Sequence, residues 1–236
     1  MAKSDLEIIY EDNHLIAINK PNGLLVHTDD TGDTSLEDIL REYIREKYNK
    51  PGNVFLQSCH RLDRPVSGVL IFAKTSKGKD RMRQLFTERK VDKTYLALVT
   101  KCPDPFEGDL QNWMYKDRNK NIVEVVKGER VGAVKARTVY TTLGKIDRNY
   151  LVRLKPVTGK SHQLRVHMSF IGSPILGDVK YGGATIHDPN AFMLHCRKME
   201  FVHPIQKIPI VLKAELPELV WWRNYKDEIT TLEEQG

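Results

Sequence analysis

Short apolar segments of strand length, separated by turn residues, fill most of this sequence and limit what it can fold into. The clearest is 67–75, where the apolar run Val69–Ala73 predicts a buried strand. Weaker strand patterns recur at 6–10, 14–19, 93–100, 122–126, 133–143, 149–155, 192–202 and 208–214.

Helical spacing is confined to a few segments. It predicts helices over 35–48, 76–90 and 161–171, and the tail 221–236 is expected to be a surface helix or a frayed end. Because helices and strands do not alternate regularly, the pattern predicts an α+β fold. We expect one domain over 1–236, built on a mixed, mostly antiparallel sheet flanked by a few helices.

The composition indicates the cellular compartment in which the protein is expected. The chain has 236 residues, a formal net charge of +6 and three cysteines, Cys59, Cys102 and Cys196. So few thiols, without a CxxC pair, favour a reducing compartment, and the N-terminus lacks the apolar stretch of a secretion signal. No apolar run is long enough to cross a bilayer. We therefore expect a cytoplasmic protein without membrane attachment.

The sequence predicts neither a cofactor nor a metal site. It contains no GxxxxGK phosphate loop, no GxGxxG after a strand and no HExxH. His162 and His167 are five positions apart, which places them on different sides of a helix. An enzyme with this sequence is expected to work without either kind of group.

The segment 60–68, HRLDRPVSG, places an aspartate in a loop just before the predicted buried strand. Pro65 restricts the loop, and Asp63 lies between Arg61 and Arg64. Neighbouring guanidinium groups favour a charged carboxylate, which is the form that a nucleophile needs. An Asx turn or a surface ion pair is the alternative interpretation of the same residues.

A second dense segment, 158–183, combines a glycine-bearing turn, a short helical stretch and the run GDVKYGG. Thr158 or Ser161 could cap the short helix, whose first N–H groups could hold a phosphate. Arg165 on that helix could reach a buried carboxylate in a bidentate pair. The alternative is an ordinary amphipathic helix with surface cations.

Four motifs occur together in one order: Lys20-Pro21-x-Gly23 with Val26-His27, HRLDRPVSGVLIFAK from position 60, KTYLALV from 93 and TGKSHQLRVHMSFIGSPILGDVKYG from 158. In this combination the chain resembles the RluA-type pseudouridine synthase family. The resemblance implies a catalytic domain with a central RNA-binding cleft. It also implies that uridine in RNA is isomerised to pseudouridine without a cofactor.

The resemblance implies roles for single residues. Asp63 is the catalytic residue, Arg165 pairs with it, and Tyr95 lies in the active site, where it could accept the C2′ proton if a glycal forms. Arg61 enters the helical stack where the base leaves, since a stacked base must be flipped out before it can react. Lys20 and its neighbouring proline help to form the wall of the cleft.

Most of the excess positive charge lies in 74–93, which has eight Lys or Arg residues against three acidic ones. The predicted helix in this stretch is expected beside the cleft, in contact with RNA phosphates, and a solvated helix face is the alternative. The predicted RNA-binding residues are Lys20, Arg61, Arg64, Lys77, Lys79, Arg81, Arg83, Lys160 and His162.

The chain differs from the family pattern in two places: Pro65-Val66-Ser67-Gly68 replaces a Thr-Ser-Gly run, and Lys160 replaces the commoner arginine. No S4-like N-terminal domain is expected, so the catalytic domain itself must recognise a stem-loop of ribosomal or transfer RNA, as a monomer. Two other functions stay open. One is an RNA-binding or RNA-folding protein without catalysis, and the other is a hydrolase that releases the base.

Overall fold

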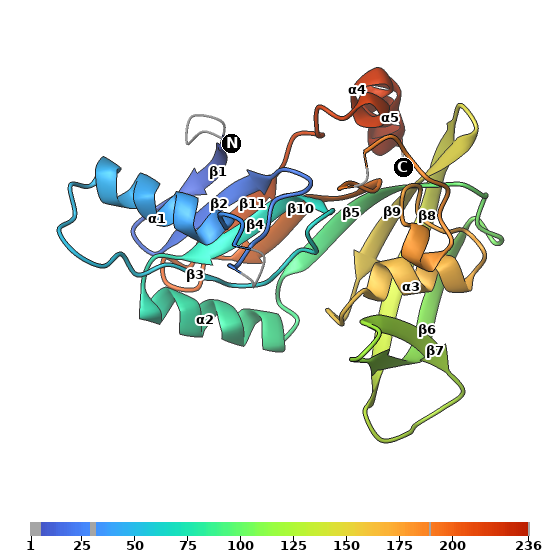
Figure 1. Ribbon diagram of the computed structural model, residues 1–236, viewed down its shortest axis with the longest axis horizontal. Coiled ribbons are helices and arrows are strands. Elements are labelled where there is room, and N and C mark those ends of the chain that lie inside the picture. Colours follow the sequence, from blue (N-terminus) through green and yellow to red (C-terminus); the bar gives the residue numbers. More distant parts are fainter. Residues whose placement is uncertain (1–5, 29–31, 189, 236) are drawn as a thin grey trace. The chain divides into compact units, whose positions relative to one another are not determined.

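The computed structural model of the protein describes residues 6–28, 32–188 and 190–235 (Figure 1). It divides into two compact units. The first contains the residues up to Asp92 together with Cys196–Pro217, and the second contains Lys93–His195 together with the C-terminal residues from Glu218. Each unit is therefore built from segments that are far apart in the sequence.

A largely antiparallel sheet forms the centre of the first unit. Its strands are β1 (Glu7–Glu11), β2 (Leu15–Lys20), β3 (Gln57–Ser58), β4 (Ser67–Ala73), β10 (Leu194–Val202, from Cys196 in this unit) and β11 (Pro209–Lys213). β2 pairs with β1 and β4, β3 also pairs with β4, and β10 lies next to β4 and pairs with β11. All seven residues of β4 are buried, which explains its uninterrupted apolar run.

Two helices accompany this sheet (Figure 1, left). α1 (Leu36–Lys47) begins with a capping box between Ser35 and Asp38, and its buried residues lie at helical spacing. α2 (Ser76–Thr87) begins after Thr75, whose hydroxyl accepts a backbone N–H of the first turn, and it packs against β4. Both helices were predicted, although α2 ends earlier than position 90.

A second antiparallel sheet forms the other unit. Its strands are β5 (Asp92–Val99, from Lys93 in this unit), β6 (Glu107–Asp117), β7 (Ile122–Val126), β8 (Ala133–Ile146) and β9 (Asn149–Pro156). They are arranged in the order β5-β9-β8-β6-β7. α3 (Gln163–Phe170) packs on β7, β8 and β9, and a 3-10 turn, η2 (Val179–Tyr181), follows it.

A small apolar core joins α3 to this sheet and is formed by Met114, Val123, Ala136 and Val166. The described chain ends in α4 (Val220–Asn224) and α5 (Lys226–Gln235), of which α5 contacts β8. These helices correspond to the predicted C-terminal tail, except Gly236, which lies outside the described residues.

The predicted α+β class with a mostly antiparallel sheet is confirmed, and every predicted strand and helix coincides with an observed one. The two-residue β3 and the long β6 were not predicted. The first half of β6 alternates between exposed and half-buried residues and has no fully buried one, and its sequence, EGDLQNWMYKD, shows no clear apolar alternation. The single catalytic domain over 1–236 stays a prediction. In the part of the chain that the structure describes, every helix is too short or too polar to cross a lipid bilayer.

Candidate active site

Asp63 lies in the loop between β3 and β4 and is half-buried. Its carbonyl accepts the N–H of Val66 at 2.9 Å, which closes a tight turn. Arg61 is exposed, and the exposed Arg64 donates to Asp33 at 2.8 Å. The predicted loop is therefore present, and it carries a carboxylate that is partly open to solvent.

Lys20 was predicted to contact RNA, and in the structure it lies beneath this loop with 0% of its surface exposed. Its Nζ donates to the carbonyls of Pro21 at 2.9 Å, Arg64 at 2.9 Å and Val66 at 2.8 Å. Burial lowers the pKa of Lys20 to about 7, and the negative charge of Asp63 opposes that shift. Lys20 thus anchors the residues that follow Asp63, and its contact with RNA stays a prediction.

The first motif, Lys20-Pro21-x-Gly23, forms a turn that is fastened to the same loop. The Gly23 N–H donates to the Arg64 carbonyl at 2.9 Å, and Arg64 Nε donates back to the Gly23 carbonyl at 2.9 Å. Asn22 Nδ2 donates to the Pro65 carbonyl at 2.5 Å. Two motifs more than 40 residues apart in the sequence therefore form one loop assembly around Asp63.

Gly68 fixes the point at which this loop enters the sheet. Its φ is +109°, and a Cβ there would lie 2.2 Å from the carbonyl oxygen of Cys196 on β10. Any side chain would push β4 away from β10 and displace the loop that precedes it. The glycine is therefore required by both the backbone conformation and the strand spacing.

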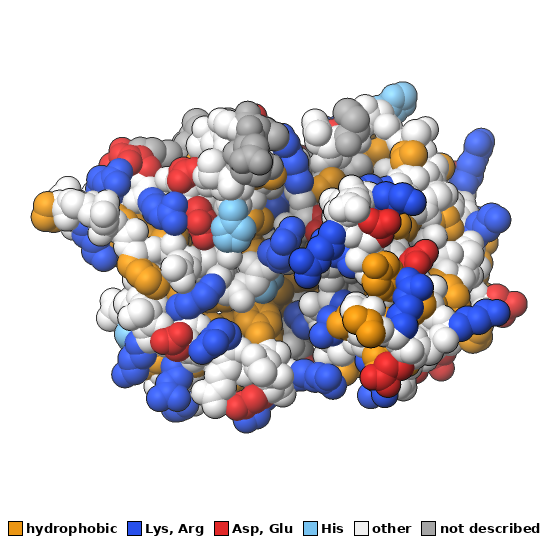
Figure 2. Space-filling model, turned by 60° about the horizontal axis from the view of Figure 1, so that its bottom comes forward, with side chains coloured by type: hydrophobic (Ala, Val, Ile, Leu, Met, Phe, Trp, Pro, Cys, Tyr) orange, Lys and Arg blue, Asp and Glu red, His pale blue; other side chains and the backbone are white. Residues whose placement is uncertain are grey.

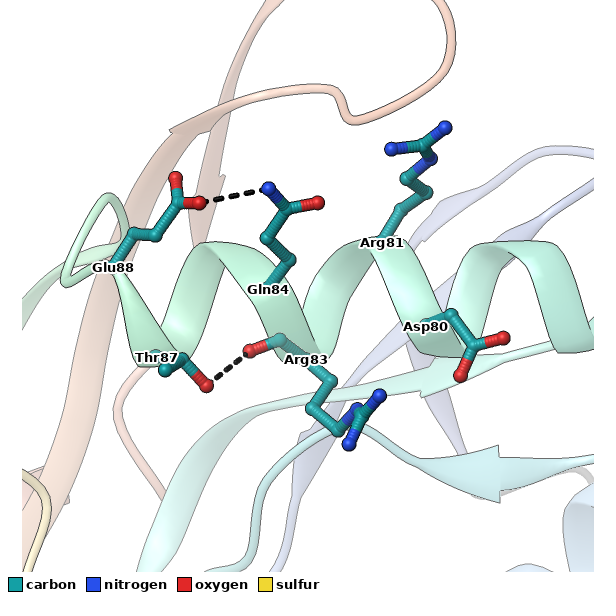
Figure 3. Close-up of a pocket in the computed structure, with 6 residues that line it drawn as sticks. All are labelled: Asp80, Arg81, Arg83, Gln84, Thr87 and Glu88. Carbon is teal, nitrogen blue, oxygen red and sulfur yellow. Dashed lines mark hydrogen bonds between the residues drawn. The ribbon is translucent and has the colours of Figure 1, made fainter.

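The predicted basic helix is α2. Lys77, Arg81 and Arg83 are exposed on it, whereas Lys79 is half-buried and donates to the Ser58 carbonyl. Lys and Arg side chains, in blue, recur over the lower left of Figure 2, where the region of α2 comes forward. Figure 3 shows the hollow along the helix, which is lined by Asp80, Arg81, Arg83, Gln84, Thr87 and Glu88.

Part of the positive charge of the stretch 74–93 is already paired with acidic residues. Lys74 is buried and pairs with Glu11 at 2.6 Å, and Lys90 pairs with Glu88 at 2.7 Å. Not every basic residue of this stretch is therefore open to phosphates, and the contact of the exposed α2 cations with RNA stays a prediction.

The turn before α3 is held in a way that the sequence did not predict. His162 occupies the N-cap position with a left-handed backbone, φ 52°, and makes no side-chain cap. Instead, Gln163 Oε1 accepts the Lys160 N–H at 3.0 Å and the Thr158 hydroxyl at 2.6 Å, and its amide donates to a carbonyl of β8 at 2.9 Å. The predicted cap by Thr158 or Ser161 is therefore wrong, because the first helical residue fastens the turn to β8.

Arg165 forms a bidentate pair with a buried carboxylate, as its place on the helix suggested, and this partner is Asp178. Nε lies 2.6 Å from Oδ2, and Nη2 lies 2.8 Å from Oδ1. The guanidinium also lies over the rings of Tyr181 and Phe192. The pairing with Asp63 that the resemblance implies concerns a residue of the other unit and stays a prediction.

The remaining predicted residues also belong to the second unit. Tyr95 lies on β5 opposite Leu154 and is 9% exposed. Lys160 is exposed in the turn before α3, and Nδ1 of His162 lies 2.7 Å from the Tyr181 hydroxyl. Their contacts with RNA or substrate stay predictions.

Sequence reasoning missed the residues that support these side chains. Gln163 holds the turn before α3. Asp178 pairs with Arg165, and the Tyr181 hydroxyl contacts His162. The run GDVKYGG stood out in the sequence, but its contact with α3 depends on a tight turn that spacing does not show. Within the described ranges, no group of three or more His, Cys, Asp or Glu residues could hold a metal ion.

The α+β fold, the anchored aspartate loop and the buried arginine agree with the family resemblance that the motif order suggested. Residues 14–170 match the family model described as RNA pseudouridylate synthase. The chain therefore belongs to this family, and its motifs place it among the RluA-type members. It is an isomerase that converts uridine in RNA to pseudouridine.

Individual relatives match along most of the chain. The tRNA pseudouridine synthase C of Vibrio parahaemolyticus is 32% identical over 236 residues, which cover 92% of this chain and 93% of that protein. The ribosomal large subunit pseudouridine synthase C of Buchnera aphidicola is 34% identical, over 94% of this chain and 70% of that protein. The solved structure of human RNA Pseudouridylate Synthase Domain Containing 4 has a TM-score of 0.74 and 28% identity, over 90% of this chain and 89% of that one.

Proposed function

We propose that Asp63 is the nucleophile of this isomerisation and that the target uridine is flipped out of a stem-loop to reach it. The anchored loop is the observation that supports this proposal. Asp63 is half-buried, and the residues that follow it are held by buried Lys20 and by the turn at 20–23. A carboxylate on a fixed backbone with access from solvent meets the requirements of a nucleophile.

The proposed reaction replaces the N-glycosidic bond of uridine with a C-glycosidic bond. The C1′–N1 bond of uridine breaks and a C1′–C5 bond forms, so C5 loses its hydrogen and N1 gains one. Asp63 bonds to the ribose or the base while the detached uracil turns, and it leaves as the new bond closes. Tyr95 packs on the uracil. If a glycal forms, Tyr95 accepts the C2′ proton and returns it to C2′ as the C1′–C5 bond closes, and Arg165 keeps Asp63 ionised.

RNA recognition in this proposal comes from the same chain. Arg61 stacks in the space that the flipped base leaves, because a planar guanidinium can stack and bind phosphate at once. The exposed cations of α2 bind backbone phosphates. The proposed active form is a monomer in the cytoplasm.

We further propose that the substrate is transfer RNA. The relative named tRNA pseudouridine synthase C matches over nearly the whole of both chains, whereas the ribosomal relative is matched over 70% of its length. Purified protein given the transfer RNA and ribosomal RNA fractions separately, both carrying tritium at C5 of uridine, distinguishes the two. Tritium loss from the ribosomal fraction alone would contradict the substrate proposal.

Tritium release also tests the nucleophile, because C5 exchanges its hydrogen for the bond to C1′. Asp63→Asn keeps the side-chain shape and is expected to release no detectable tritium, while its affinity for the RNA stays within about twofold of wild type. The matched control is Asp109→Asn, which removes the charge of an exposed aspartate paired with Arg137 and should leave the rate unchanged.

The outcomes separate the remaining functions. Tritium release by Asp63→Asn at the wild-type rate contradicts the nucleophile proposal. Tight RNA binding without release by either protein would indicate a silent RNA-binding protein. Free uracil in solution would indicate a base-removing hydrolase.

A further inference from the structure

The guanidinium of Arg165 is held at one edge and packed against two rings within the second unit. Arg165 is 7% exposed and Asp178 is 2% exposed, so the carboxylate supplies the partner without which a buried charge is costly. The ring centroids of Tyr181 and Phe192 lie 4.9 and 4.6 Å from Cζ of Arg165. These contacts leave the guanidinium little freedom to rotate.

The ring of Tyr181 is itself fixed through its hydroxyl. The hydroxyl oxygen accepts the N–H of Val123 at 2.9 Å and lies 2.7 Å from Nδ1 of His162. Val123 is part of the small core between α3 and the sheet. Tyr181 therefore cannot turn away from Arg165 without breaking its hydrogen bond to β7.

Asp178 is fixed by the turn that follows it. Its carbonyl accepts the N–H groups of Tyr181 at 3.0 Å and Gly183 at 2.9 Å, and its own N–H donates to Ile175 at 3.0 Å. A Cβ at Gly183 would lie 2.0 Å from the Ile175 carbonyl oxygen, so only glycine lets the turn close this tightly. The carboxylate is thus presented to α3 from a rigid backbone.

We propose that Asp178, Tyr181 and Phe192 are positioning residues that fix the orientation of the Arg165 guanidinium for catalysis. Asp178 binds the edge formed by Nε and Nη2, and two hydrogen bonds to one carboxylate set the plane of the whole guanidinium group. The proposal rests on the proposed pairing of Arg165 with Asp63. An arginine that is already oriented needs no reorganisation during the reaction, which is how fixed charges lower a barrier.

A double-mutant cycle of Asp178→Asn and Arg165→Met tests this proposal, read by single-turnover pseudouridine formation on saturating RNA. Asp178→Asn keeps the side-chain shape and should slow the chemical step about 100-fold, the size expected for a misplaced catalytic group. The double variant should be no slower than Arg165→Met alone, within about twofold. RNA affinity should stay near wild type in all four proteins, because the change is in kcat and not in binding.

Asp178→Glu provides a second measurement if Asp178→Asn fails to fold with its arginine unpaired. It keeps the charge but displaces the carboxylate by one methylene, so we expect a folded protein with normal RNA affinity and a slower chemical step. The exposed bidentate pair of Asp109 and Arg137 supplies the matched control, since Asp109→Glu should change neither rate nor melting temperature.

Two results would overturn the positioning role. One is a folded Asp178→Glu protein with the wild-type rate, and the other is a double variant slowed by the product of the two single effects. A different result would contradict the proposed pairing of Arg165 with Asp63 itself. In that case Arg165→Met would convert RNA at the wild-type rate.

Discussion

Lys20 is a charged side chain with 0% of its surface exposed, and each of its hydrogen bonds goes to a backbone carbonyl. Two of these carbonyls belong to Arg64 and Val66, directly after the proposed nucleophile. The positive charge beneath the loop also attracts Asp63. One buried residue therefore links the first sequence motif to the second.

Lys20→Met keeps much of the side-chain volume but removes the ammonium donor from those carbonyl oxygens, of which the Arg64 oxygen keeps the Gly23 N–H. We expect the free energy of unfolding to fall by about 3 kcal/mol, since buried acceptors lose hydrogen bonds to a charged group. Conversion of RNA should slow as the loop loosens. Urea unfolding and single-turnover rates measure both effects, and the exposed Lys101→Met is the control. Unchanged stability with weakened RNA binding would instead support a direct contact of Lys20 with RNA.

Among single residues, the sequence predicted the candidate catalytic side chains better than the residues that hold them in place. Asp63 and Arg165 stood out because their motifs carry the resemblance. Asp178 and Gln163 lie in the same motif as Arg165 but were given no role, because their contacts depend on a tight turn and a left-handed residue, respectively. The local sequence pattern identifies a residue and its neighbours along the chain, but it does not show which distant segment that residue contacts in the fold.

Among the elements, α2 presents the clearest test of RNA contact. Lys77, Arg81 and Arg83 are exposed, whereas Lys79 is tied to the Ser58 carbonyl and is left unchanged in the test. Replacing the exposed cations by glutamine should lower the slope of log affinity against log salt by about 0.7–0.9 for each phosphate that the helix no longer neutralises. Filter binding between low and moderate salt measures that slope.

The control carries the same reduction of charge at other exposed positions of the first unit: Arg45→Gln, Lys50→Gln and Lys213→Gln. This control should bind RNA with the wild-type salt slope. Equal slopes in the two triple variants would show that α2 is only a solvated surface.

The elements also show where sequence patterns work. β4 and α1 were predicted because burial on both faces, or along one stripe, leaves an apolar pattern of the matching period. β6 was missed because the covered face of its first half is only half-buried, so hydrogen bonds to β7 and β8 hold the strand without a clear apolar pattern. A strand that is held mainly by hydrogen bonds to its neighbouring strands has no clear pattern in its own sequence.

In the whole molecule, the candidate site residues are divided between the two units. Asp63 and the α2 cations belong to the first, and Tyr95 and Arg165 belong to the second. The sequence predicted the fold class through its pattern of strands and helices, and the candidate residues through motif order. It did not show that the chain returns to the first unit at Cys196, because that depends on pairing between distant strands.

One buried histidine links the stability of the folded chain to pH. His167 on α3 is 0% exposed, and its Nδ1 lies 2.8 Å from the Thr138 hydroxyl. Its Nε2 has no hydrogen-bond partner among the residues that the structure describes. Burial therefore lowers the pKa of His167 from 6.5 to about 4.

Between these two pKa values the unfolded chain binds a proton at His167 and the folded chain does not, so stability must fall as pH falls through this interval. The contribution is complete above pH 6.5 and is lost by about pH 4, which amounts to about 3 kcal/mol. Urea unfolding at a series of pH values should show this loss in wild type and a smaller loss in His167→Gln. The exposed His187→Gln is the control and should follow wild type. A wild-type profile that coincides with that of His167→Gln would show that His167 does not couple folding to pH.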